Sequence, residues 1–311
     1  MKEKQTPLLE VSELSVAFRM YDGALGQREL KVISSLSITV RPGEVLAIAG
    51  SSGSGKSLLA SAILGILPDN AIVRGDMSFN GQPLIPERQK ALRGSEIALV
   101  PQSVAYLDPL MKVGRQADGH RKPYPTEKRR RLFRRLELPD RTEQLYPFQL
   151  SGGMARRVLV STALIQDARL IIADEPTPGM SLEQALEALK LFREMADEGR
   201  GVVLITHDID LAFAFADRIA VFYAGTTVET ATAADFRRGP EALRHPYSKA
   251  LWRALPQNGF QPIEGFQPYA DHLPTGCLFA PRCPLRTPEC EQAMPPVRQV
   301  RDGEVRCFHA T

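Results

Sequence analysis

The chain has 311 residues, 43% of them hydrophobic and 24% charged, which is enough for a full α/β core and a smaller appended module. The formal net charge of +3 is too small to indicate nucleic acid as a partner. We find no signal-peptide pattern at the start and no run of 18 apolar residues, so we expect any membrane role to be peripheral.

The first hundred residues predict strands around a glycine-rich loop. Period-two alternation over residues 8–40 indicates β-structure, and the largely apolar run 44–49 is typical of a parallel strand buried on both faces. An apolar helical pattern begins near Lys56. Two further short strands are expected at 77–80 and 97–100.

The middle of the chain is rich in arginine and predicts helices. Leu132, Phe133 and Leu136 form a narrow apolar stripe on one expected helix. We interpret the basic run 128–135 as a solvated helix face, with contact to anionic lipid headgroups as the lesser alternative.

Strand signals return in the second half of the chain, at 170–173, 202–206 and 219–222, with a helix expected at 182–198. This strand–helix–strand order predicts a parallel sheet. From about Pro240 onward, proline and aromatic residues increase and the periodicity is lost, which indicates a boundary in composition.

The glycine-rich loop reads GSSGSGKS and fits the phosphate-binding pattern G-x-x-x-x-G-K-[ST]. Glycines let the backbone approach phosphate oxygens and turn its N–H groups inward. Lys56 would place its charge on the β- and γ-phosphates, and the Ser57 hydroxyl would bind Mg²⁺. The strand before the loop and the helix after it argue against a chance match. The predicted nucleotide-binding residues are Gly50, Ser51, Ser52, Gly53, Ser54, Gly55, Lys56 and Ser57.

An acidic pair ends the apolar strand LIIADE. Asp174 would hold the Mg²⁺ shell, and Glu175 would orient or deprotonate the attacking water. Two acids after a strand could equally be a solvated turn, but the phosphate-binding loop upstream favours the catalytic interpretation.

Three further motifs complete a family pattern. Residues 150–154 read LSGGM, which resembles the LSGGQ signature of ABC transporter ATPases. Gln102 follows strand IALVP as the glutamine of that family's Q-loop does, and His207 in LITHD resembles its switch histidine. The order of the motifs also matches, and the resemblance covers almost the whole chain.

The resemblance implies a head-to-tail pair of ATPase subunits with ATP between them. Ser151, Gly152 and Gly153 would then serve the partner's ATP, through N–H groups at the start of a helix. His207 would hydrogen-bond the γ-phosphate and steady the water, and Gln102 would bind Mg²⁺ and report the γ-phosphate to the helical region. Phe18 matches the family's adenine-stacking position, with Tyr21 as the competitor.

One departure concerns the run after Glu175, where Ser181 stands at a position that is usually Asp in the family. A neutral hydroxyl cannot replace the charge-assisted bonds of a carboxylate. This puts in doubt the communication between the two ATP sites, and it leaves open a nucleotide-regulated module that does not hydrolyse ATP.

The cysteines follow C-x₅-C-x₆-C-x₁₆-C, without the close pairs that structural zinc sites usually show. This part resembles the C-terminal extension of oligopeptide- and dipeptide-transporter ATPases, beginning near His245-Pro246-Tyr247. The resemblance implies a [4Fe–4S] cluster, with Zn²⁺ or free thiols as alternatives. The expected ligands are Cys277, Cys283, Cys290 and Cys307.

The resemblance implies an α/β P-loop ATPase with an N-terminal antiparallel β subdomain. The expected units are an ATPase domain at 1–238, a helical subdomain at about 103–166, and the extension at 239–311. The expected function is ATP hydrolysis that drives import of di- or oligopeptides, with nickel or a metal chelate as the alternative and a soluble ABC-type ATPase as a remote one. Expected partners are a second ATPase subunit, preferably in a heterodimer, two permeases and an extracytoplasmic substrate-binding protein. The chain would lie on the cytoplasmic face of the membrane.

Overall fold

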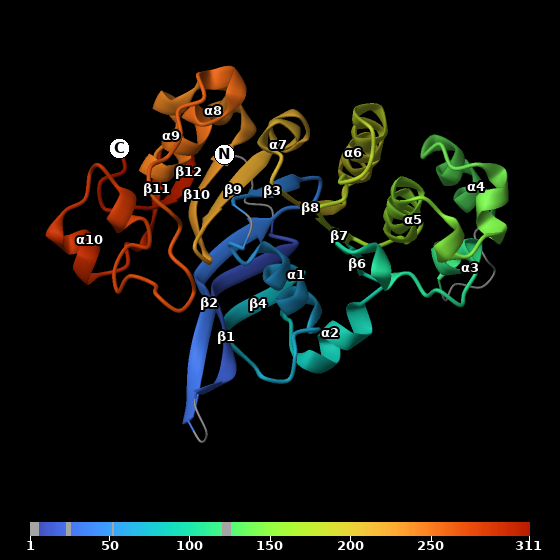
Figure 1. The fold of residues 1–311 in the computed structure, drawn as a ribbon, viewed down its shortest axis with the longest axis horizontal. Helices are drawn as coiled ribbons and strands as arrows, with labels where there is room; N and C mark the ends of the chain where they lie inside the picture. The colour runs from blue at the N-terminus through green and yellow to red at the C-terminus, as the bar shows by residue number, and fades with distance from the viewer. Residues whose placement is uncertain (1–5, 23–25, 52, 120–125) are drawn as a thin grey trace.

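The computed structural model describes residues 6–22, 26–51, 53–119 and 126–311 (Figure 1). Within these ranges the strands form a four-stranded sheet of order β2-β1-β4-β5 and an eight-stranded sheet of order β11-β12-β10-β9-β3-β8-β7-β6. The strands are β1 (Leu9–Asp22), β2 (Gly26–Val40), β3 (Val45–Ala49), β4 (Ala71–Phe79), β5 (Gln82–Pro83), β6 (Ile97–Val100), β7 (Leu170–Asp174), β8 (Gly201–Thr206), β9 (Arg218–Tyr223), β10 (Thr226–Thr232), β11 (Val297–Val300) and β12 (Gly303–Arg306).

Helices lie on both faces of the larger sheet (Figure 1). None of those in the described ranges combines the length and the apolar character that crossing a bilayer requires. The helices are α1 (Lys56–Leu64), α2 (Pro86–Leu92), α3 (Val113–Asp118), α4 (Thr126–Arg135), α5 (Gly152–Leu164), α6 (Leu182–Asp197), α7 (Ile209–Phe215), α8 (Ala233–Arg238), α9 (Pro246–Arg253) and α10 (Pro288–Gln292).

The parallel strands β3, β7 and β8 at the centre of the larger sheet are fully buried, as their apolar runs predict. Alternate residues of β3 enter two different apolar clusters. Ala47 packs in the cluster that contains the buried face of α6, and Ile48 packs in the cluster that contains α1 and the antiparallel sheet. The sheet is therefore covered on both faces, and its strand ends are left to form a site.

Helices α3 and α4 lie beyond one end of the larger sheet, remote from the C-terminal part of the chain (Figure 1). The predicted apolar stripe is buried, but the interpretation of the basic run 128–135 as a solvated face is wrong for Arg129. Arg129 is buried and pairs with Asp118 and Glu143, while Arg135 forms ion pairs with carboxylates of α6. Asp118 and Glu143 compensate for the burial of the Arg129 charge. The composition of the segment alone does not reveal these partners.

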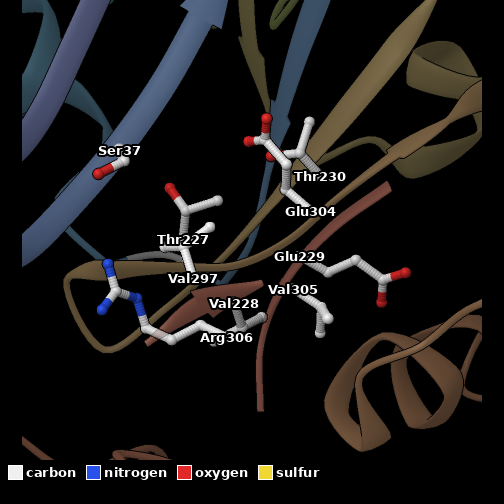
Figure 2. Close-up of a pocket in the computed structure, with 9 residues that line it drawn as sticks. All are labelled: Ser37, Thr227, Val228, Glu229, Thr230, Val297, Glu304, Val305 and Arg306. Carbon is white, nitrogen blue, oxygen red and sulfur yellow. The ribbon is translucent and has the colours of Figure 1, made fainter. Parts of the chain in front are cut away.

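The C-terminal extension is continuous with the core sheet, because β12 pairs antiparallel with β10. Arg306 closes this junction by donating to Glu13 Oε1 at 2.9 Å and to the Ser35 carbonyl at 2.7 Å. Figure 2 shows the seam between β10, β11, β12 and Ser37 of β2. The seam encloses about 10 Å³, barely the space of one water, so we treat it as a packing joint rather than a ligand site.

A buried ion-pair group fastens the start of the extension. The Arg244 guanidinium pairs with Glu229 at 3.3 Å and Asp235 at 3.1 Å, and all three residues are buried. His245 follows, and its backbone N–H donates to Glu229. Burial lowers the pKa of His245 to about 3, so this imidazole is neutral in the folded protein.

Candidate active site

The phosphate-binding loop predicted from the sequence connects the end of β3 to the start of α1. Gly53 and Gly55 have φ values of 78° and 92°, a region that favours glycine. A Cβ on Gly50 would lie 2.5 Å from the Phe222 carbonyl oxygen, so a side chain does not fit there. Ser52 lies outside the described residues. The backbone conformation at Gly53 and Gly55 and the close approach at Gly50 therefore favour glycine at all three positions.

Lys56 is 5% exposed and lies in the concave side of this loop. Its Nζ donates to the carbonyl oxygens of Gly50 at 2.9 Å and Ser51 at 2.8 Å. Burial lowers the pKa of Lys56, while the negative charges of Glu175 and Asp174 oppose that shift. The positive charge of the amine thus lies beside two carboxylates, in the loop that the sequence pattern assigns to phosphate binding.

Asp174 and Ser57 fit a bound Mg²⁺. The Asp174 carboxylate is buried, and its Oδ1 has no hydrogen-bond partner. Burial raises the pKa of Asp174, and a hydrogen bond with the Ser57 side chain opposes the shift. A buried carboxylate oxygen without a partner, beside a hydroxyl, is a donor set that Mg²⁺ prefers.

Glu175 lies between two of the other predicted catalytic side chains. Its Oε2 accepts from Gln102 Nε2 at 3.0 Å, and its Oε1 lies 3.2 Å from His207 Nδ1. The backbone φ of Glu175 is 47°, which is uncommon for a residue other than glycine and typical of functional sites. The carboxylate is therefore held by side chains from two further loops.

These residues line one open cleft of about 330 Å³. The lining residues are Val32, Gly53, Gly55, Lys56, Ser57, Leu58, Gln102, Glu175 and His207. An anion site and a carboxylate that can accept a proton thus face the same space, which is what hydrolysis of a phosphoanhydride requires.

Arg156 is a site residue that sequence reasoning missed. It lies on α5, is buried, and donates to the Pro101 carbonyl at 3.0 Å and to the Gln102 carbonyl. Burial lowers the pKa of Arg156, and Glu175 and Asp174 oppose the shift. An arginine in a helix is usually exposed, so the residue type gave no reason to select Arg156. The only available signal was its position in the sequence, two residues after the end of the signature motif. Arg156 fixes the backbone that carries Gln102.

The register of β1 and β2 supports Phe18 as the candidate for adenine stacking. Phe18 pairs with Leu30, and Val32, two residues further along β2, lines the cleft. Tyr21 is 87% exposed and lies further out on the hairpin. Phe18 stays a prediction.

The signature residues do not line the cleft of their own chain. Ser151 caps α5 by accepting from Met154 N at 3.3 Å, and both Ser151 and Gly152 are exposed. A Cβ on Gly153 would meet the Gly179 carbonyl at 2.8 Å. Their exposure at a helix start leaves N–H groups available to a second chain.

Ser181 has a clear structural role. It caps α6, accepting from Gln184 N at 3.3 Å, while Gln184 Oε1 accepts from Ser181 N in a capping box. The serine therefore preserves helix capping, although it lacks the charge of the carboxylate usual in the family.

The four thiols of the extension interact electrostatically with one another. The pKa of Cys277 is raised to about 11, mainly by burial and in smaller part by the charges of the other three thiols. His309, which the sequence analysis missed, lies 3.4 Å from Cys290 Sγ and donates its backbone N–H to Cys307 Sγ. Among the described residues, however, no group of three or more His, Cys, Asp or Glu side chains is arranged to hold a metal ion. The four thiols suit a cluster in number and kind, but their arrangement here does not.

The phosphate-binding loop follows the buried parallel strand β3, and the acidic pair ends β7, which is separated from β3 in the sheet by β8 alone. This arrangement defines a P-loop nucleoside triphosphatase. The family model for ABC transporters matches residues 33–178, and the model for the oligopeptide/dipeptide transporter C-terminal region matches residues 228–290. The oligopeptide transport ATP-binding protein OppD of Salmonella typhimurium is 35% identical over 97% of this chain and 93% of its own length. The dipeptide transport ATP-binding protein DppD of Haemophilus influenzae is also 35% identical, over 96% of this chain and 94% of its own.

The chain therefore belongs to the ABC transporter ATPases, as an ATP-hydrolysing subunit. Among solved structures, a dimeric ATP-binding cassette bound to ADP and Pi matches with a TM-score of 0.63 and 24% identity, covering 72% of this chain and 98% of that chain. At that identity the match supports the fold alone.

Proposed function

We propose that this chain hydrolyses ATP to power the import of dipeptides or oligopeptides. One observation carries the proposal: the 35% identity to an oligopeptide transport ATP-binding protein extends over 97% of the chain and includes the C-terminal region. Nickel is named in neither of the two matching family descriptions nor in the two relatives above, so peptides are preferred as the cargo.

The chemistry follows from the cleft. Lys56 and the loop N–H groups bind the β- and γ-phosphates, and Ser57, Asp174 and Gln102 would hold Mg²⁺, which neutralises phosphate charge. Glu175 takes a proton from water as the water oxygen bonds to the γ-phosphorus. The bond from that phosphorus to the bridging oxygen breaks, and the products are ADP and phosphate. His207 steadies the γ-phosphate and the water.

The proposed assembly places the chain on the cytoplasmic face of the membrane, beneath two permease subunits that an extracytoplasmic binding protein supplies with peptide. A second, similar ATPase would present its signature residues to this cleft, while Ser151, Gly152 and Gly153 would serve the partner's ATP. Support comes from the exposure of Ser151 and Gly152 outside their own cleft. The substrate does not contact this subunit in such an assembly.

The cysteine site is proposed to hold a [4Fe–4S] cluster, with Zn²⁺ as the alternative. The electrostatic coupling of the four thiols supports a common site, although it requires their closer approach. Protein purified without oxygen should be brown and contain about four irons per chain. Colourless protein with one zinc, or with no metal, would reject the cluster.

Uptake in cells tests the transport function. Deleting the gene should abolish uptake of labelled dipeptide or oligopeptide, and the wild-type chain should restore it while Lys56→Ala should not. A deletion strain that takes up peptide normally but has lost uptake of radioactive nickel would replace the peptide proposal with the metal one.

A further inference from the structure

The C-terminal extension contains a long segment without helix or strand, residues 259–279, which we call the extension arm. It connects the short 3-10 turns Pro256–Asn258 and Ala280–Arg282. A segment of this length without secondary structure is uncommon in a compact domain, and is usually functional when it is ordered. Figure 1 shows the extension at the left of the view, next to β10.

The extension arm contacts the phosphate-binding loop directly. The Ser51 hydroxyl donates to Gln267 Oε1 at 2.6 Å, across 216 positions of sequence. The Ser51 carbonyl oxygen also accepts a hydrogen bond from Nζ of Lys56, the lysine of the phosphate-binding loop. One residue of the loop is therefore held through its side chain by the extension and through its backbone by the catalytic lysine.

A second residue of the extension reinforces this contact. Burial raises the pKa of Tyr247 on α9 to about 12, and a hydrogen bond with the Ser51 side chain opposes the rise. A hydroxyl can donate one hydrogen bond and accept another. Ser51 can thus donate to Gln267 and accept from the protonated phenol of Tyr247.

The extension arm is itself anchored to the rest of the protein close to Gln267. Arg282 Nε donates to the Glu264 carbonyl at 2.7 Å, and its Nη2 donates to the Ile263 carbonyl at 3.0 Å. The same guanidinium lies 5.9 Å from the ring centroid of Tyr223 and donates to its hydroxyl at 3.3 Å. Tyr223 is fully buried at the end of β9. The arm is therefore braced against the core sheet three residues before Gln267.

We propose that Gln267 is a positioning residue for nucleotide binding, through which the C-terminal extension holds the phosphate-binding loop in shape. A loop that is ordered before the nucleotide arrives loses less conformational entropy on binding, so its affinity is higher. The inference deepens the proposed ATPase site and rests on it. It gives the extension a function at the nucleotide site that does not require a metal.

Calorimetric titration of the full-length chain with MgATP tests this role. Gln267→Ala should raise the dissociation constant about threefold to tenfold, the effect of losing one ordinary hydrogen bond. Gln261→Ala is the matched control, because Gln261 is an exposed glutamine of the same arm. It should bind as wild type does. In the assembled transporter, Gln267→Ala should raise KM for ATP while kcat stays within about twofold.

A double-mutant cycle separates this contact from a general loss of packing. If Ser51 and Gln267 act through one bond, Ser51→Ala combined with Gln267→Ala should weaken binding no more than the larger single effect. Multiplying effects, or an unchanged dissociation constant in Gln267→Ala, would overturn the role of the arm. Wild-type protein that failed to bind MgATP would instead overturn the ATPase assignment, so the two failures are distinguishable.

Discussion

Replacing Glu175 by glutamine tests the catalytic assignment most sharply, because the two side chains have the same shape. The carboxylate is held at 3.0 Å by Gln102 and at 3.2 Å by His207, and it lines the cleft with Lys56. An amide can keep one of these contacts as an acceptor, but it cannot take a proton from water. Glu175→Gln therefore removes the base and little else.

The expected loss of rate equals the contribution of a positioned general base, which accelerates a reaction roughly a hundredfold to ten-thousandfold. The barrier should rise by about 3 to 5 kcal/mol. Binding should not weaken, because removing a negative charge beside Lys56 favours a polyanion. We expect kcat to fall by roughly that factor while the dissociation constant for MgATP stays equal or decreases.

The assay is phosphate release by the assembled transporter at saturating MgATP, together with titration of nucleotide binding. Glu10→Gln is the control, since Glu10 is an exposed carboxylate on β1 outside the cleft. It should hydrolyse ATP as wild type does. Phosphate release by Glu175→Gln within about threefold of wild type would refute the role of Glu175 as the base.

Three further predictions concern single residues. Ser181→Ala should lower the free energy of unfolding by about 1 kcal/mol in urea, whereas Ser181→Asp, which can still cap α6, should not; equal stabilities would contradict the capping role. Phe18→Ala should raise the dissociation constant for MgATP about twofold to tenfold, while Tyr21→Ala should leave it unchanged; the reverse order would assign the adenine contact to Tyr21. Because burial lowers the folded-state pKa of His245 to about 3, the unfolded chain takes up this proton first as the pH falls below about 6.5. The free energy of unfolding should then decrease by about 1.4 kcal/mol per pH unit from this residue, and His245→Asn should remove that part of the slope.

The parts of the fold that could be predicted from the sequence are those with strong local patterns. The apolar runs of β3, β7 and β8 predict buried strands because both of their faces are covered. β11 could not be predicted in this way, since its residues alternate only between exposed and half-buried. The strand β12, which pairs with β10, depends on contacts between residues more than 70 positions apart. Such pairing leaves no local signal.

The same contrast holds for the candidate site. Lys56, Asp174 and Glu175 could be predicted because phosphate chemistry restricts residue type and spacing within short motifs. Arg156 and Gln267 act through backbone carbonyls or one hydroxyl, which many residue types could contact, so their identity carries little information. Their roles emerge only once the folded chain brings them to Gln102 and Ser51.

The central claim is that the loop around Lys56 binds a nucleoside triphosphate. Titration of the assembled complex with MgATP, compared with the same complex carrying Lys56→Ala, measures this directly. We expect saturable binding by the wild-type complex, and loss of binding at this chain's site in Lys56→Ala. Equal binding by both complexes, or no binding by either, would contradict the account.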